Sequence, residues 1–350
     1  MATTQIDAKA HALPLLKRWQ IAIDSCNAPD IHSTDTLTRW LVISRACVFS
    51  MTLTSSLIGV LLAASLDAFT ERPLLKAWFA VLVVIGLLAA HASNNLVNDW
   101  TDVKRGVDTE DYPRAQYSPH PVLGGLTRPD TLLRVALGLT ALDGVIMLYL
   151  AAMGRPWVIA LGGSGLAISL EYTIFLKRFA LGEVAALTVW GPLMIGGAVY
   201  AISGTLTWDA LLTAVPYGLI VASVLIGKHT DKITNDAPIG VHSIPVIVGE
   251  RRALIFNKAM FVLFYAMVVG LVVSGVSGPW ILLSFLAVPR LLTAWKIYSR
   301  PRPAAKPENW PVWPLWYVGW ALYFNREAGK WFILGLLLNL LVPVVIGVLG

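Results

Sequence analysis

Acidic and amide side chains gather where an apolar stretch of the sequence ends, in the segment NNLVNDWTDVKRGVD. They recur there at spacings of three and four: Asn95, Asn98, Asp99 and Asp102. Residues at these spacings share one face of a helix. Carboxylates crowded on one face repel each other unless a cation lies between them, and hard oxygen ligands of this kind suit Mg²⁺, which often bridges to a substrate phosphate. We therefore predict that metal ligands come from Asn98, Asp99, Asp102 and Asp108.

A second cluster follows a later apolar stretch, in the segment KHTDKITNDAPIG that begins at Lys228. Asp231 and Asp236 are five residues apart, which is about 140° around a regular helix, so they do not share one face. Either a helix ends between them, or Asn235 takes a place among the ligands. Solvated helix ends at headgroup level are the simpler explanation for one such cluster. Two clusters favour a functional site, because ionisable groups at membrane depth are costly.

The composition is that of an integral membrane protein. Of the 350 residues, 56% are hydrophobic and 14% are charged, and the mean hydropathy is +0.67. Soluble domains have about 25% charged residues. A helix needs roughly 20 mainly apolar residues to cross the hydrocarbon. Nine stretches meet this requirement: 41–66, 77–97, 132–152, 156–176, 182–203, 208–227, 254–275, 279–297 and 331–349. We therefore predict an all-α, polytopic protein with nine transmembrane helices.

The positive charges indicate the orientation of these helices. With a cytoplasmic N-terminus, only three of the 27 basic residues fall outside: Arg72, Lys76 and Arg155. Cytoplasmic loops carry such an excess of Lys and Arg. The net charge of +6 is thus explained by topology, and we expect no nucleic-acid binding.

The same topology divides the chain. Residues 1–40 form a polar cytoplasmic segment that is too long and too polar to begin a cleaved signal peptide. Residues 41–349 form one membrane domain with two acidic cytoplasmic loops, at 98–131 and 228–253. These loops follow the second and sixth predicted helices, which suggests two similar helical units.

Cysteine and histidine add little to the predicted site. Cys26 and Cys47 are the only cysteines and form no CxxC motif, so they support neither a disulfide framework nor a thiolate metal site. His91 and His120 are single histidines, which are more often structural than catalytic, and we include neither among the site residues.

Three segments resemble one family. NDWTDVKRGVD resembles the first aspartate-rich motif of the UbiA superfamily of intramembrane prenyltransferases, particularly its dihydroxynaphthoate-prenylating branch, and DKITNDAPIGVHSIPVIVGE resembles the second. EYTIFLKRFALGE, residues 171–183, is similar to the family's Tyr…Lys-Arg segment. The resemblance spans roughly residues 40–349. The chain departs from the family pattern at Gly106, where many members have an acid that Asp108 replaces, and in its DxxxxD spacing.

The resemblance implies a helical bundle around a central cavity and Mg²⁺-dependent transfer of a prenyl group from an isoprenyl diphosphate to an aromatic acceptor, as in quinone biosynthesis. The catalytic acids would be Asp99, Asp102, Asp231 and Asp236. Magnesium bound by both clusters, the second including Asn235, would hold the diphosphate. The substrate would contact Lys104, Arg105, Tyr172, Lys177, Arg178, Lys228 and Lys232.

Two other functions remain open at this stage. A UbiA-type terpene cyclase ionises the same diphosphate but quenches the cation internally. A secondary transporter would place ionisable groups near the bilayer midplane, whereas the polar groups here crowd one face. We expect the lipid bilayer as surroundings, no obligate protein partner, and an active site toward the cytoplasm.

Overall fold

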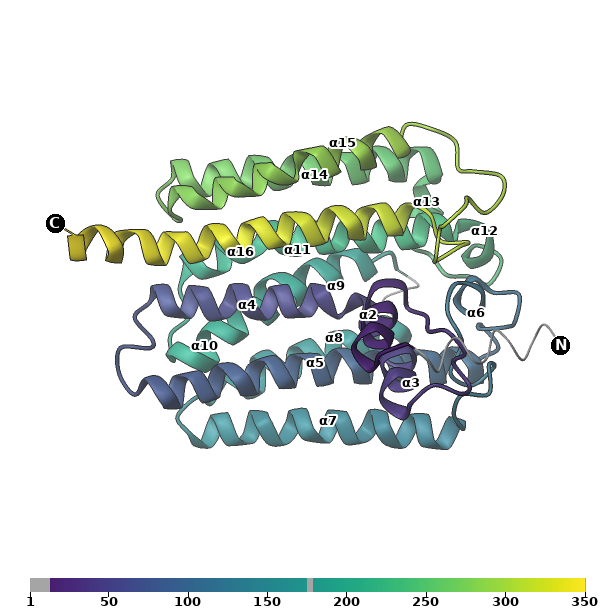
Figure 1. Cartoon of the computed structure of the whole chain (residues 1–350), viewed down its shortest axis with the longest axis horizontal. Coiled ribbons are helices and arrows are strands. Elements are labelled where there is room, and N and C mark those ends of the chain that lie inside the picture. Colours follow the sequence, from purple (N-terminus) through teal and green to yellow (C-terminus); the bar gives the residue numbers. More distant parts are fainter. Residues whose placement is uncertain (1–12, 175–178, 350) are drawn as a thin grey trace. The chain divides into compact units, whose positions relative to one another are not determined.

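The computed structural model describes residues 13–174 and 179–349, with only the backbone at 170, 172–174 and 343–349. All regular secondary structure in the described residues is helical, with no strand. The helices, shown in Figure 1, are α2 (Leu15–Ser25), α3 (Thr36–Ile43), η1 (Ala46–Val48), α4 (Phe49–Ser65), α5 (Pro73–Lys104), α6 (Pro113–Tyr117), α7 (Pro129–Ala152), α8 (Trp157–Ile174), α9 (Gly182–Thr188), η3 (Val189–Gly196), α10 (Gly197–Ser203), α11 (Trp208–Asp231), α12 (Ile233–Asp236), α13 (Ile244–Val248), α14 (Glu250–Val273), η4 (Pro279–Ala287), α15 (Val288–Ile297) and α16 (Tyr317–Leu349).

The predicted apolar stretches are helical. Within the described residues, 7 helices are long and apolar enough to cross a membrane: Ala46–Ser65, Pro73–Lys104, Pro129–Ala152, Gly182–Ser203, Trp208–Asp231, Glu250–Val273 and Pro279–Ile297. The two other predicted stretches fall in α8, whose apolar part Trp157–Ser169 is shorter, and in the 33-residue helix α16. The all-helical, multi-pass membrane character expected from the sequence is therefore confirmed.

The helices form two compact units, which we describe separately. The first unit contains residues 13–50, 89–141 and 303–315. Its apolar core joins α3, the end of α5 and the start of α7 through Ile43, Leu96 and Leu132, each at most 1% exposed. Asn95 of the first polar segment donates a hydrogen bond to the carbonyl of Ser44 (2.9 Å), and so fixes the turn that follows α3.

A disulfide joins Cys26, which follows α2, to Cys47 in η1. The two Cα atoms are 5.1 Å apart, within the range that a disulfide spans. From the sequence we found no support for a disulfide framework, and the structure corrects this with one bond between the two cysteines. Two cysteines 21 residues apart form no sequence motif that would predict their pairing, and the packing of α2 beside η1 brings them together.

The second unit contains the described parts of residues 51–88, 142–302 and 316–350. Helix α11 is its centre: it packs against α9, η3, α14 and α16, the last two of which run alongside it in Figure 1. The approach of η3 depends on glycine, because a Cβ on Gly218 would lie 2.5 Å from the carbonyl oxygen of Leu187 and 2.9 Å from the Cα of Gly191. The backbone of η3 kinks at Gly191, next to Pro192. This contact fixes α11, whose last residue is Asp231.

Candidate active site

The first acidic motif lies in the first unit, at the end of α5. The helix stops because Gly106 adopts a left-handed conformation (φ +68°), which favours glycine. The amides of Val107 and Asp108 then both donate to the carbonyl of Asp102 (2.8 and 3.2 Å), as in the common glycine-terminated helix end. The reversed chain places Asp108 beside the end of α5.

Asp99 is fully buried between two arginines. Arg114 forms a two-pronged contact with its carboxylate, from Nε to Oδ1 (3.0 Å) and from Nη2 to Oδ2 (2.8 Å). Arg45 donates a further hydrogen bond to Oδ1. A carboxylate can be buried only when it is paired and hydrogen-bonded, and the guanidinium fork is the strongest such partner. The charges of Arg45 and Arg114 also act on Asp108, so the arginines and the carboxylates of this unit form one electrostatic cluster.

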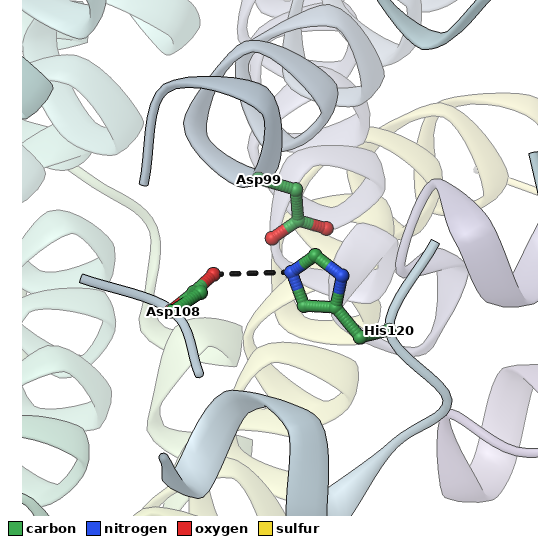
Figure 2. A group of neighbouring side chains, drawn as sticks. All are labelled: Asp99, Asp108 and His120. Atoms are coloured by element: carbon green, nitrogen blue, oxygen red, sulfur yellow. Dashed lines mark hydrogen bonds and ion pairs between the residues drawn. The ribbon is translucent and has the colours of Figure 1, made fainter. Parts of the chain in front are cut away.

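Asp102 and Asp108 are also buried, 7% and 4% exposed. Asp108 Oδ2 lies 3.2 Å from Nε2 of His120, and Figure 2 shows both side chains pointing toward the carboxylate of Asp99. Burial raises the pKa of Asp108, but the hydrogen bond from His120 and the charges of Arg45 and Arg114 outweigh it, so its pKa is below the usual value. Asp108 therefore stays ionised at neutral pH.

These groups fit a divalent cation. One candidate ligand atom each from Asp99, Asp108 and His120 lie within 4.8 Å of one another. Carboxylate oxygen is the ligand that Mg²⁺ prefers, and Asp102 and Asn98 add further oxygens on the same helix end. Three hydrogen bonds already occupy Asp99, so Asp108 is better suited than Asp99 to bind a cation in this unit.

The second motif lies in the second unit and is built differently. Helix α11 ends at Asp231, and a separate turn, α12, begins at Ile233. Of the two alternatives left open by the spacing, the helix thus ends between the two acids. Asp231 accepts hydrogen bonds from the backbone amides of Tyr317 (Oδ1, 2.9 Å) and Val318 (Oδ2, 2.9 Å), the first two residues of α16.

Asp236 is 1% exposed and pairs with Lys232 one turn earlier, with 3.4 Å between Nζ and Oδ1. Asn235 is half-buried beside it. The second motif therefore offers one buried acid near a lysine, Asp236, and one that supports a helix start, Asp231.

A buried pair that the sequence did not reveal adjoins this motif. His229 Nδ1 lies 2.7 Å from Oε1 of Glu183, and both residues are less than 5% exposed. The amide of Ile244 donates to the same oxygen (3.3 Å). Within the described residues, Glu183 Oε2 has no hydrogen-bond partner. The third family-like segment ends at Glu183, which was the available signal for this residue.

The predicted substrate-binding residues differ in their surroundings. Lys104 and Arg105 are exposed, and Nζ of Lys104 lies 4.3 Å from the ring centre of Trp100. Lys228 and Lys232 are half-buried. Lys177, Arg178 and the side chain of Tyr172 lie outside the described residues.

The buried cations that the structure places against carboxylates are Arg45 and Arg114, which the sequence analysis counted only as topology. Arg45 had a usable signal, because it is a single charge within the predicted apolar stretch 41–66, where ionisable residues usually mark function.

Comparisons with known proteins extend these observations. The profile described as UbiA prenyltransferase family matches residues 52–318. The 1,4-dihydroxy-2-naphthoate octaprenyltransferase of Bacillus subtilis is 27% identical over 248 residues, 70% of this chain and 78% of that protein. The protein of the same name from Mycobacterium tuberculosis is 27% identical over 62% of this chain and 73% of its own length. UbiA prenyltransferase domain-containing protein 1 of Homo sapiens is 26% identical over 59% of this chain and 61% of its own length.

Two solved structures share the fold. A UbiA homologue from Archaeoglobus fulgidus bound to DMAPP and Mg²⁺ superposes with a TM-score of 0.53 at 15% identity, over 84% of this chain and 98% of that chain. A digeranylgeranylglyceryl phosphate synthase superposes with a TM-score of 0.57 at 17% identity, over 86% of this chain and 98% of that chain.

The helical fold and the buried acidic motifs define a multi-pass membrane enzyme. The chain belongs to the UbiA prenyltransferase family and is a prenyltransferase. The family resemblance drawn from the three sequence segments is thereby confirmed.

Proposed function

We propose that this protein transfers a prenyl group from an isoprenyl diphosphate to a small aromatic acceptor in a Mg²⁺-dependent reaction, as in quinone biosynthesis. The observation that carries the proposal is the buried carboxylate cluster of the first unit, in which Asp108 and Asp102 accompany the Arg45–Asp99–Arg114 group. Relatives named as 1,4-dihydroxy-2-naphthoate octaprenyltransferases support an aromatic acceptor of the naphthoate class.

In this proposal each motif binds Mg²⁺. The main ligands are Asp102 and Asp108 in the first motif, with Asn98 beside them, and Asp236 in the second motif, with Asn235 beside it. Asp99 and Asp231 would bind a cation only through oxygen lone pairs that are not already used by hydrogen bonds, which come from arginines for Asp99 and from backbone amides for Asp231. When bound, Mg²⁺ supplies Lewis-acid stabilisation of the diphosphate as a leaving group.

The reaction breaks the bond between the allylic carbon and the diphosphate oxygen, and the diphosphate leaves with the bonding electrons. A ring carbon of the acceptor forms the new carbon–carbon bond, and the ring loses a proton. The ring of Tyr172 would face the cationic allylic carbon, and such a cation–π interaction contributes about 0.5–2 kcal/mol. Positive side chains would share the charge of the diphosphate: Lys104, Arg105, Lys177, Arg178, Lys228 and Lys232.

Product analysis tests the reaction. Purified protein is incubated with Mg²⁺, prenyl diphosphates of several chain lengths and a panel of aromatic acids that includes 1,4-dihydroxy-2-naphthoate, and the products are identified by mass spectrometry. A prenylated aromatic product supports the proposal. A cyclised hydrocarbon or alcohol formed without acceptor would assign a terpene cyclase instead, and prenylation that persists in excess EDTA would refute the metal requirement.

We also propose the topology expected from the charges: residues 41–349 cross the membrane nine times, with the N-terminus, residues 1–40 and both acidic loops in the cytoplasm. Alkaline phosphatase, which is active only outside the cytoplasm, can be fused after Gly154 or Gly204 in the predicted outside connections. Those fusions should be active, whereas fusions after Gly125 or Gly240 should be inactive. The reverse pattern would place the active site on the opposite face.

A further inference from the structure

His120 is the centre of a tight turn in the first unit, between α6 and α7. The amide of Gly124 donates to the carbonyl of His120 (2.9 Å), and the amides of Leu126 and Thr127 donate to that of Pro121 (3.0 Å each). A Cβ on Gly124 would lie 2.7 Å from the carbonyl oxygen of His120, so the turn closes only around glycine. His120 is 2% exposed, and its imidazole points inward toward the first acidic motif, as Figure 2 shows.

The hydrogen bonds of this ring define its tautomer. Nδ1 lies 3.2 Å from the backbone nitrogens of Val122 and Leu123, and both amides donate to it. A nitrogen that accepts two N–H groups carries no proton, so the proton of the neutral ring is on Nε2. Nε2 then donates to Oδ2 of Asp108 at 3.2 Å.

The same contacts favour the neutral ring, because a second proton on Nδ1 would meet the two amides that donate to this nitrogen. A neutral imidazole orients a carboxylate without cancelling its charge. Asp99 is in the opposite situation, since two arginines neutralise it. Asp108 is thus held in place by a neutral donor and keeps its negative charge for a cation.

We propose that His120 is a positioning residue of the metal site: its Nε2–H holds Oδ2 of Asp108 so that the carboxylate faces Mg²⁺, while its Nδ1 ties the ring to the turn. The inference rests on the proposed function, because it assumes that Asp108 binds the metal. In this arrangement His120 is not itself a ligand, since both ring nitrogens are occupied by protein contacts. Removal of a side chain that hydrogen-bonds a metal ligand typically weakens metal binding roughly ten- to hundredfold.

Two substitutions separate the two nitrogens. His120→Gln places an amide NH₂ at the position of Nε2 and keeps the donor to Asp108, but it lacks an acceptor at Nδ1. His120→Asn places a carbonyl oxygen at the position of Nδ1 and keeps the acceptor for Val122 and Leu123, but it lacks the donor to Asp108. A positioning role and a purely structural role therefore predict opposite results for the same two variants.

Mn²⁺ serves as the probe, because it occupies oxygen sites of this class and its binding is measured directly by electron paramagnetic resonance. The full-length protein in detergent is titrated with Mn²⁺ in the presence of inorganic pyrophosphate, and thermal unfolding is followed in parallel without metal. We expect His120→Asn to bind Mn²⁺ roughly ten- to hundredfold more weakly than wild type, with little change in unfolding temperature. We expect His120→Gln to bind Mn²⁺ nearly as tightly as wild type while unfolding at a lower temperature.

Asp108→Asn is the control that separates the inference from the proposed function. If Asp108→Asn weakens Mn²⁺ binding and His120→Asn does not, the positioning role is refuted while the metal site stands. If His120→Gln weakens Mn²⁺ binding as much as His120→Asn, the hydrogen bond to Asp108 is not what matters, and the inference is refuted. If wild type and Asp108→Asn bind Mn²⁺ equally, the metal site of the proposed function fails, and the inference fails with it.

Discussion

Asp231 supports the start of helix α16, and replacing it with alanine should lower the thermal stability of the protein. Its two carboxylate oxygens accept hydrogen bonds from the backbone amides of Tyr317 and Val318, both at 2.9 Å, and Asp231 itself is 4% exposed. These amides belong to the first turn of a helix, where no partner exists within the helix itself. The substitution therefore leaves two backbone donors without an acceptor.

The expected loss follows from these two donors. A buried donor that loses its acceptor costs about 1–3 kcal/mol, and removal of a helix cap costs about 0.5–2 kcal/mol. For two amides at a helix start we expect a total of about 2–4 kcal/mol. At about 2–4 °C per kcal/mol for a large domain, the unfolding midpoint should fall by roughly 5–15 °C.

The assay is thermal unfolding followed by circular dichroism in detergent, without Mg²⁺ or diphosphate. Asp209→Ala is the matched control, because it removes a carboxylate from the same helix, α11, at an exposed position in its first turn. Exposed substitutions of this kind change stability by about 0.5 kcal/mol or less. Equal midpoints for Asp231→Ala and Asp209→Ala would refute the capping role and return Asp231 to the role of a metal ligand alone.

Three further outcomes are expected. Asp102→Ala should abolish turnover in a protein that still unfolds cooperatively, and near-normal rates would show that the first motif does not bind the catalytic metal. Arg114→Lys should destabilise the protein by roughly 1.5–3 kcal/mol, because a single ammonium cannot replace the two contacts to Asp99; thermal unfolding measures this, with the exposed Arg105→Lys as control, and equal midpoints would contradict it. Lys177→Gln should lower kcat/KM for the prenyl donor by about ten- to a hundredfold while acceptor dependence stays unchanged, and unchanged donor kinetics would leave Lys177 as a topology signal only.

The helices and the positions of the acidic motifs could be predicted because both depend on local sequence. An apolar stretch of membrane length is helical almost wherever it occurs, since the bilayer core offers backbone groups no other partner. The polar residues that interrupt such stretches then mark helix ends. Asp99 and Asp102 lie in the last turns of α5, and Asp231 is the last residue of α11.

The partners of these acids could not be predicted, because they come from distant parts of the chain. Arg45 is 54 residues from Asp99, and Tyr317 is 86 residues from Asp231. No periodic pattern relates such positions. His120 was set aside because a single histidine is usually structural, and its contact with Asp108 depends on a turn that closes through backbone hydrogen bonds.

The acids of the two motifs look equivalent in sequence, but the structure gives them different electrostatic surroundings. Asp99 is neutralised by two guanidinium groups, and Asp231 accepts two amides from a helix start, whose partial positive charge favours an anion there. Asp108 accepts its hydrogen bond from His120, and Arg45 and Arg114 act on it through their charges without the contacts that they make to Asp99. A cation gains most from a carboxylate whose charge no other group has cancelled, so equal spacing in an aspartate-rich motif does not imply equal roles. Within this family member, we expect metal affinity to depend more steeply on Asp108 than on Asp99, even though Asp99 is the more deeply buried of the two.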